Sequence, residues 1–344
     1  MITPTRPARE TTVFFGLALL LSVPFWVVGA VSDATITAAL SVASLMIVAP
    51  FLAAVLLTWR AGGGRSVRTL LARAVDPWLP HGARWYLPVL LLMPAAVLVE
   101  VGLLRLAGRE VPGFEFTPFA LVADLALFWV AATLEEVGWT GYATDRLLAI
   151  RGRLVTALVI GVVWALWHVP AMLAMPGEHS WTWILLQCLN QVIVRVLIVG
   201  IYVGSGGSLF AAIGLHALLN LSTLTLFPVN GSHYDPLVAN VVLGLAAVLT
   251  LHSWGTSAPG WLARAVGRLR TSLGRDGSRG HGRSSGYVAV GLTLGPALGY
   301  AVGRGLGDPD SALLTAGLGA ILGIILGSVL AKRASPGSAH ARWP

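Results

Sequence analysis

Three polar clusters lie within long apolar stretches of this 344-residue chain. They are Glu135-Glu136 in TLEEVGWTGY, His168 in WALWHVP, and His216 with Asn220 in GLHALLN. Because an ionisable side chain within a membrane span is costly, such groups usually face a bundle interior or a cavity and mark a functional site. Two carboxylates, two imidazoles and an amide can activate water and stabilise an oxyanion. We therefore expect a hydrolase site, and in the first place an intramembrane peptidase.

Helical spacing limits which of these groups share a face. Glu135 and Glu136 differ in direction by about 100°, so only one can point squarely at a given centre while the other binds a supporting donor. Asp124 lies about three turns earlier, near the face of Glu135. His216 and Asn220 are four residues apart and share one face. Each pair alone also fits a simpler role, as interfacial solvation or as a polar contact between helices.

The single histidine in WALWHVP follows Trp164 by one turn, so the indole can shelter His168. Pro170 can kink the helix and free a backbone carbonyl. A lone histidine is more often an interhelical hydrogen-bonding group than a ligand. The glutamate pair elsewhere in the chain favours a functional role for His168.

A further cation, Arg195, lies in an apolar stretch beside Asn190 and Gln191. A buried guanidinium needs a carboxylate partner. Asp124, Glu100 and the glutamate pair are the candidates, and the pairing is either structural or catalytic.

Composition places these clusters in a membrane protein. The chain is 56% hydrophobic and only 11% charged, against about 25% charged residues in soluble domains. We predict an all-α, polytopic helical bundle in the lipid bilayer. The net charge of +8 is attributed to cytoplasmic loops and not to nucleic-acid binding. The single cysteine, Cys188, excludes an intramolecular disulfide and a cysteine-based metal site, and we expect a small buried hydrophobic side chain there.

Ten apolar stretches have about the 20 residues that a spanning helix needs. The first follows the polar start MITPTRPARE and is interpreted as a retained helix, because it is too long for a signal-peptide core. The predicted spans are 12–31, 36–58, 85–107, 117–138, 154–175, 181–203, 208–227, 236–254, 286–303 and 311–331.

Basic residues alternate between the connections of these spans. The connections after the second, fourth and eighth predicted spans are rich in arginine, including the stretch 60–84 and the stretch 264–283, whereas the odd-numbered connections are short and poor in basic residues. Since basic residues gather on the cytoplasmic side, we predict a multi-pass protein of the cell membrane with both termini in the cytoplasm.

The predicted spans divide the chain into three parts. Residues 1–254 form an eight-span domain, and residues 255–285, rich in Gly, Ser and Arg, form a flexible basic linker. Residues 286–333 form a glycine-rich transmembrane pair with Gly299 and Gly303 and the run Gly319, Gly323 and Gly327. Small residues at this spacing let helices approach closely. The pair is either a local hairpin or a surface for a dimer or a membrane-protein partner.

The segment 139–153 is too polar to span and is predicted to form a short amphipathic helix at the cytoplasmic interface. Glu135 would then end a span near that interface, whereas His168 would lie about 20 Å deep at 1.5 Å per residue. The groups can meet only if the fourth helix extends, if the fifth begins outside the lipid core, or if a water-filled cavity joins them.

The three motifs, in this order, resemble those of the CPBP (Abi) intramembrane proteases, which include CAAX prenyl endopeptidases and bacteriocin-processing enzymes. That family carries Glu-Glu-x-x-x-Arg, aromatic-x-x-x-His and His-x-x-x-Asn motifs on successive helices. The matches here are Glu135-Glu136, Trp164 with His168, and His216 with Asn220, within a protease-like core at 117–227.

The position of the family's arginine is occupied by Thr140. Thr140 carries no charge for the glutamate pair. Either Arg195 or Arg146 supplies that charge from elsewhere, or the site is altered.

The resemblance implies cleavage of a peptide or prenylated protein at the cytoplasmic side, with Glu135, Glu136, His168, His216 and Asn220 as catalytic residues. Glu135 would activate a water with His168, and His216 and Asn220 would stabilise the oxyanion. A metalloprotease version would hold zinc with Glu135, His168 and His216; otherwise no cofactor is expected.

Two other classes remain open from the sequence. The chain could be a catalytically altered scaffold or partner-binding protein on the same fold, with Thr140 as the sign of that change. It could also be a transporter in which buried Glu, His and Arg relay protons, although no inverted repeat is visible.

Overall fold

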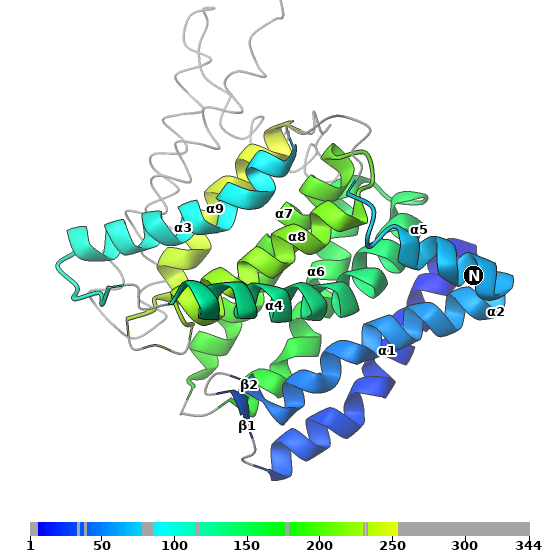
Figure 1. Cartoon of the computed structure of the whole chain (residues 1–344), viewed down its shortest axis with the longest axis horizontal. Helices are drawn as coiled ribbons and strands as arrows, with labels where there is room; N and C mark the ends of the chain where they lie inside the picture. The colour runs from blue at the N-terminus through cyan, green and yellow to red at the C-terminus, as the bar shows by residue number, and fades with distance from the viewer. Residues whose placement is uncertain are drawn as a thin grey trace, which may run out of the picture. The chain divides into compact units, whose positions relative to one another are not determined.

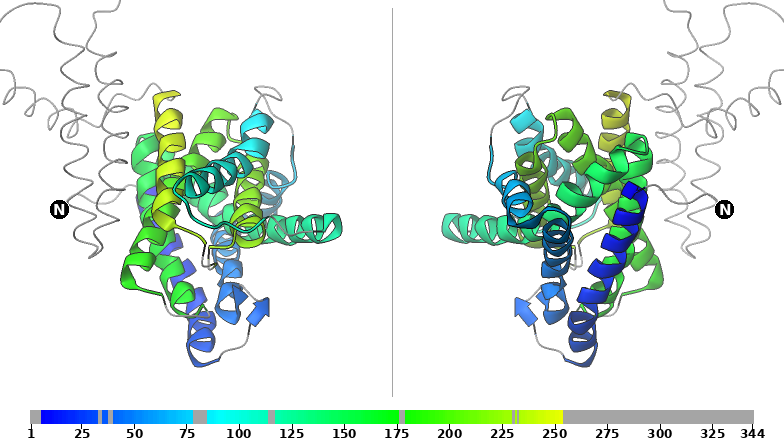
Figure 2. Two further views of the ribbon diagram at one scale, coloured as in Figure 1. Left: turned by 90° about the vertical axis from the view of Figure 1, so that its left-hand side faces the viewer. Right: turned by 90° about the vertical axis from the view of Figure 1, so that its right-hand side faces the viewer.

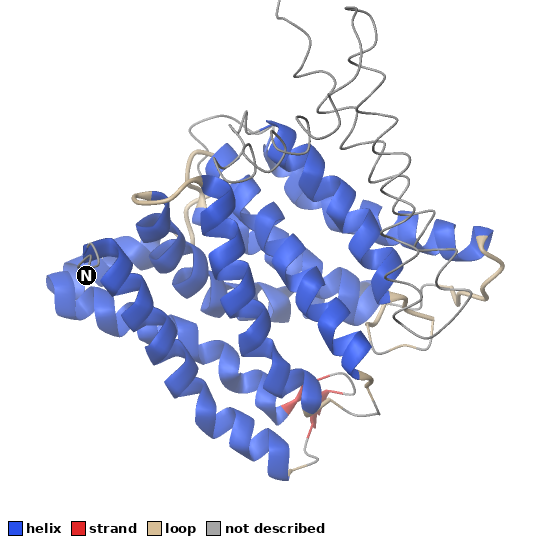
Figure 3. Cartoon of the chain, turned by 180° about the vertical axis from the view of Figure 1, so that it is seen from behind, coloured by secondary structure: helices blue, strands red, loops and turns tan. Residues whose placement is uncertain are grey.

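The computed structural model describes residues 6–32, 35–37, 40–77, 85–113, 117–175, 179–229, 231 and 233–253. Nearly all of these residues are helical (Figure 3). The predicted linker 255–285 and the glycine-rich pair 286–333 lie outside the described residues.

Seven helical segments are long and apolar enough to cross a membrane, which confirms the polytopic all-α class for the part described. The eighth predicted span is also a helix, but its apolar part, Pro236–Leu251, is shorter than these seven. The main helices are α1 (Arg6–Val31), α2 (Val48–Ala72), α3 (Tyr86–Leu106), α4 (Pro118–Gly138), α6 (Arg153–Leu173), α7 (Trp181–Gly204), α8 (Leu209–Asn220) and α9 (Pro236–Ser253).

Helices α7 and α8 form the centre of the bundle (Figures 1 and 2). More than half of each is buried within the protein, 56% for the α7 segment and 61% for the α8 segment. Helix α7 packs on α6 and α9, and α8 packs on α3 and α4, while α1 and α2 lie side by side. The helices that carry the three polar motifs are therefore neighbours.

The second span starts later and ends later than its predicted range of 36–58. A small antiparallel hairpin, β1 (Thr35–Thr37) with β2 (Leu40–Ser41), and a 3-10 turn, η1 (Val42–Ile47), precede α2. The helical run then continues to Ala72 across a kink, where Gly63 has φ +67. Only glycine adopts this conformation without strain, so a residue without Cβ is needed there. The arginines between 60 and 72, predicted to lie in a loop, are on this extended helix.

The prediction of an amphipathic interfacial helix at 139–153 was wrong. Helix α4 continues into a π-helical segment, η3 (Trp139–Thr144), and a short turn, α5 (Asp145–Leu148). Every residue of η3 is buried. The polar groups responsible for the prediction are satisfied inside the protein, as where the Thr144 hydroxyl donates to the carbonyl of Trp139 at 2.9 Å. The fourth helical segment thus runs over Pro118–Leu148, and Glu135 lies well inside it.

Large aromatic side chains pack behind the polar motifs and hold α1, α4 and α6 together. The rings of Phe14 and Trp139 are 5.4 Å apart, and those of Trp139 and Trp167 are 5.6 Å apart. The Trp167 indole also donates to the Ser22 hydroxyl at 2.7 Å. These contacts fix α6, and with it His168, relative to the helix that carries the glutamates.

Candidate active site

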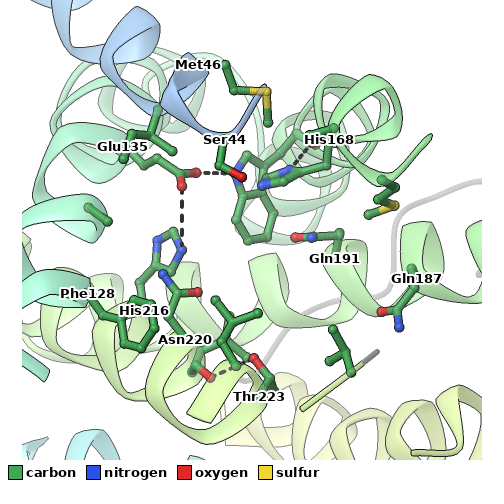
Figure 4. Close-up of a pocket in the computed structure, with 18 of the residues that line it drawn as sticks. Ser44, Met46, Phe128, Glu135, His168, Gln187, Gln191, His216, Asn220 and Thr223 are labelled. Atoms are coloured by element: carbon green, nitrogen blue, oxygen red, sulfur yellow. Dashed lines mark hydrogen bonds and ion pairs between the residues drawn. The ribbon is translucent and has the colours of Figure 1, made fainter. Parts of the chain in front are cut away.

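A cavity of about 290 Å³ joins the three predicted motifs. Glu135 of α4, His168 of α6, and His216 with Asn220 of α8 all line it (Figure 4). Ser44 and Met46 of η1 lie across from α8 in the same view. Since α4 extends beyond its predicted end, the side chains meet despite the difference in depth expected from the spans.

Glu135 is the cavity-facing member of the glutamate pair and is 3% exposed. The Trp164 indole Nε1 donates to its Oε2 at 2.8 Å, and its Oε1 lies 4.0 Å from Nε2 of His216. One carboxylate oxygen is therefore anchored, while the other faces the second histidine. This arrangement holds the carboxyl group in a fixed direction with Oε1 left free of the indole.

His168 is oriented by its own helix. Its Nδ1 lies 2.8 Å from the Trp164 carbonyl oxygen. A carbonyl only accepts, so Nδ1 carries the proton and Nε2 is the acceptor of the neutral ring. The rings of Trp164 and Trp167 meet the imidazole edge to face at 4.9 and 4.7 Å. The indole predicted to shelter His168 thus also binds Glu135.

Glu136 points away from the cavity and is fully buried. Its Oε1 lies 2.8 Å from Nδ1 of His216, and Thr140 donates to its Oε2. Because a carboxylate accepts the Nδ1 proton, the His216 ring presents Nε2 towards Glu135 and the cavity. Glu136 therefore orients a cavity-lining histidine from behind.

Arg195 neutralises Glu136. Its Nη1 lies 2.8 and 3.1 Å from the two carboxylate oxygens, and both side chains are 0% exposed. The guanidinium carbon also lies 4.2 Å from the centre of the Trp164 ring. Gly161 makes this approach possible, since a Cβ there would lie 3.1 Å from the Cα of Val192 and 3.2 Å from the Cβ of Arg195. Of the partners predicted for Arg195, the structure selects the glutamate pair.

The other predicted partners lie elsewhere. Asp124 accepts from the hydroxyl of Thr225 at 2.9 Å, and Arg146 pairs with Glu10 of α1 at 2.8 Å. Glu100 is buried on α3, beside a separate apolar cluster that includes Val97 and Val101. Arg146 is thus not a substitute for the family's arginine.

The comparisons with known proteins concern this same region. A model of the family "Type II CAAX prenyl endopeptidase Rce1-like" matches residues 117–222. Residues 117–222, which contain all three polar motifs, are therefore similar to this family. A curated relative, "CAAX prenyl protease 2" of Methanococcus maripaludis, is 38% identical over 87 residues, which are 24% of this chain and 32% of that protein. The chain therefore matches about a third of the length of this relative.

The departure of this Rce1-like segment from the family motif has a structural compensation. Thr140 is fully buried and donates to Glu136, while Arg195 of α7 supplies the positive charge. Sequence reasoning missed the role of Thr140 as a donor, although its position four residues after Glu136 places it on the same helix face. It also missed Trp164 as the donor to Glu135.

A zinc site was predicted from Glu135, His168 and His216. Among the described residues, no group of three His, Cys, Asp or Glu side chains is placed to hold a metal ion. Catalytic zinc typically needs three protein ligands at about 2.0–2.2 Å. The zinc site therefore stays a prediction, and the steps proposed below use only protein groups and water.

Proposed function

We propose that this chain is an intramembrane endopeptidase that hydrolyses a peptide bond of a membrane-bound peptide or prenylated protein. The convergence of Glu135, His168, His216 and Asn220 on one cavity carries this proposal. The Rce1-like match and the name of the archaeal relative support the substrate class.

Glu135 acts as the general base. Its Oε1 takes a proton from a water molecule while the water oxygen attacks the carbonyl carbon of the scissile bond. His168 accepts the second water proton in a hydrogen bond at Nε2, which directs the water lone pair at the substrate. When the C–N bond breaks, Glu135 returns its proton to the leaving amine.

His216 and Asn220 stabilise the oxyanion that forms during this attack. The Asn220 amide donates directly, and His216 donates from Nε2 when the ring is doubly protonated. Oε1 of Glu135 lies 4.0 Å from Nε2 of that ring, and Oε1 of Glu136 lies 2.8 Å from its Nδ1. One oxyanion donor contributes about 2.7–4 kcal/mol to transition-state stabilisation.

The direct test is cleavage of a prenylated peptide by isolated membranes that contain the full chain. We expect Glu135→Ala and His168→Ala to lose cleavage while Asp124→Asn, which alters a carboxylate bonded to Thr225, retains it. Equal processing by the wild type and both site variants would reject the peptidase and favour a scaffold on the same fold.

A metal-dependent version of this site stays a prediction, and it is tested separately. Metal analysis of purified protein and cleavage with and without a chelator distinguish the two schemes. If the protein contains stoichiometric zinc and a chelator stops cleavage, the mechanism in which Glu135 alone activates water is wrong. A zinc-dependent mechanism is then favoured.

We also propose that both termini lie in the cytoplasm and that cleavage occurs on that side. The support is the arginine-rich character of the connections after the second, fourth and eighth predicted spans. Labelling of single cysteines introduced at Ser66 and at Gly113, in a Cys188→Ala background, tests this orientation. A membrane-impermeant reagent added to intact cells should label only the second site.

A further inference from the structure

Four polar or aromatic side chains of α7 line the cavity along one stripe. They are Trp183, Gln187, Asn190 and Gln191, spaced by four, three and one residues. Trp183, Gln187 and Gln191 follow one another at four-residue intervals and share one helix face, and Asn190 lies three residues after Gln187 beside them. Figure 4 shows Gln191 opposite Asn220 and Gln187 further from Glu135 along the same helix. The stripe therefore leads away from the residues proposed to react.

Gln187 is the unusual member of this stripe. It is 6% exposed, yet its Nε2 has no hydrogen-bond partner among the described residues. A buried donor without a partner costs about 1–3 kcal/mol. The Nε2 atom itself has almost no accessible surface in this conformation, so the amide must turn towards the cavity before a ligand can reach it.

The nearby Tyr234 hydroxyl does not remove this requirement. Tyr234 approaches the Gln187 side chain, and burial, reinforced by the Glu100 carboxylate, raises the pKa of Tyr234. The phenol thus stays protonated and neutral. A primary amide has two N–H donors, so a contact with one oxygen still leaves a donor for the cavity.

The lining of the cavity is neutral away from Glu135 and the two histidines. Among the described lining residues there is no Lys or Arg, and many side chains are apolar, such as Phe128, Met172 and Met175. A peptide that enters such a cavity brings backbone N–H and C=O groups, which are costly to bury unpaired. Side-chain amides supply both donors and acceptors for these groups without a charge.

The spacing of the amides suits an extended peptide. Gln187 and Gln191 are four residues apart, a rise of about 6 Å along the helix. Two residues of an extended chain span about 6.6 Å, and every second residue directs its backbone groups to the same edge. Two substrate peptide groups on one edge can therefore meet the two glutamines in register.

We propose that Gln187, Asn190 and Gln191 form a substrate-binding stripe for the backbone of an extended, uncharged peptide segment, with the Gln187 amide turning towards the cavity so that Nε2 donates to a substrate carbonyl. This inference rests on the proposed peptidase function and specifies how that site holds its substrate. The stripe determines how tightly the substrate peptide binds and which of its peptide bonds lies beside Glu135. It does not contact the reacting atoms.

The test measures binding without turnover. The probe is a synthetic farnesylated peptide with apolar residues, and the protein is the full chain carrying Glu135→Gln in detergent or lipid nanodiscs. Removing one neutral hydrogen bond weakens binding about threefold to tenfold. We expect that increase in Kd for Gln187→Leu, and a change of less than twofold for Leu189→Ala, a control on the same helix whose side chain is 48% exposed.

Peptides with single backbone amides replaced by esters locate the contact, because an ester carbonyl is a weaker acceptor. One ester position should weaken binding to the protein with Gln187 and have no further effect in Gln187→Leu. This series also works on the protein with Gln187 intact, so it decides the matter if Gln187→Leu does not fold. Equal binding of all esters, or an unchanged Kd in a folded Gln187→Leu, would overturn the stripe.

The two proposals fail separately. A chain that binds the peptide through Gln187 but never cleaves it would retain the stripe and overturn the peptidase. A chain that cleaves the peptide with the same KM in Gln187→Leu as in the wild type would retain the peptidase and overturn the stripe.

Discussion

Glu135 and Glu136 are consecutive in sequence and lie in opposite environments. Glu135 lines the cavity, with one oxygen bound by the Trp164 indole and the other 4.0 Å from His216. Glu136 is sealed behind the cavity and is bound by Arg195, Thr140 and His216. The first carboxylate is available to a substrate, and the second has its oxygens occupied by protein donors.

In the proposed mechanism, this difference separates the general base, Glu135, from the carboxylate that orients His216. Because neighbouring helix positions differ by about 100°, one dipeptide can serve both sides of a helix. His216 links the two sides, since its Nδ1 meets Glu136 and its Nε2 faces Glu135. We expect substitutions on the cavity side to change catalysis, and substitutions on the sealed side to change stability first.

The largest expected effect is on the cavity side. Glu135→Gln keeps the size of the side chain and an oxygen for Trp164 but removes the base, so kcat should fall about a thousandfold. The free energy of unfolding should change by less than about 1 kcal/mol. Cleavage kinetics and thermal unfolding in detergent, with Glu136→Gln in parallel, measure the contrast. An equal loss of stability in both variants would remove the proposed distinction.

The next effect is on the sealed side. Arg195→Met leaves Glu136 buried without its cation and should lower the free energy of unfolding by about 3–5 kcal/mol. The matched control is Arg109→Met, because Arg109 pairs with Asp235 at 2.8 Å with a side chain that is 44% exposed. An exposed pair contributes about 0–1 kcal/mol. Chemical unfolding followed by circular dichroism compares the two, and similar losses would contradict the special role of the buried pair.

The sequence was sufficient for the helical class, for the three motifs and for a pairing between Arg195 and a carboxylate. It did not decide which glutamate faces the cavity, because spacing fixes the angle between neighbours but not the rotation of a helix in its bundle. Two π-helical segments, η3 after Gly138 and η4 (Leu221–Leu226) after Asn220, were also missed. Their residues carry ordinary side chains, so the sequence pattern does not distinguish these widened turns from α-helical ones.

The interfacial prediction for 139–153 shows the same limit. A run with Thr140 and Asp145 is polar enough for a surface, yet both of these groups find a partner within the protein. Thr140 binds Glu136, and Tyr202 of α7 binds Asp145. Hydropathy counts polar atoms but does not record which of them are paired inside a folded chain.

A smaller effect is expected from the residue at the family's arginine position. Thr140→Val keeps the shape of the side chain and removes one donor to a buried carboxylate, which should lower the free energy of unfolding by about 1.5–3 kcal/mol. Thermal unfolding measures it. Combining Thr140→Arg with Arg195→Met moves the cation to the family's position and should recover part of the stability lost in Arg195→Met alone. No recovery would mean that the two positions are not equivalent in function.

The smallest effect concerns the backbone contact that sets the glutamate helix against α2. A Cβ on Gly138 would lie 2.6 Å from the carbonyl oxygen of Pro50, so Gly138→Ala must push α4 away from α2. Overpacking of this kind costs about 1–3 kcal/mol. Because Gly138 follows the glutamate pair by two residues, the displacement should also lower cleavage.

Gly102→Ala on α3 is the control for this substitution. A Cβ there meets nothing within 4 Å, and alanine in a helix interior is favoured over glycine by up to about 1 kcal/mol. In unfolding assays, the free energy of unfolding should therefore fall in Gly138→Ala and rise in Gly102→Ala. In cleavage assays, only Gly138→Ala should lose activity. If Gly138→Ala kept full activity while losing stability, the orientation of Glu135 would not depend on the contact between Gly138 and Pro50. The hydrogen bond from Trp164 would then be sufficient to orient the Glu135 side chain.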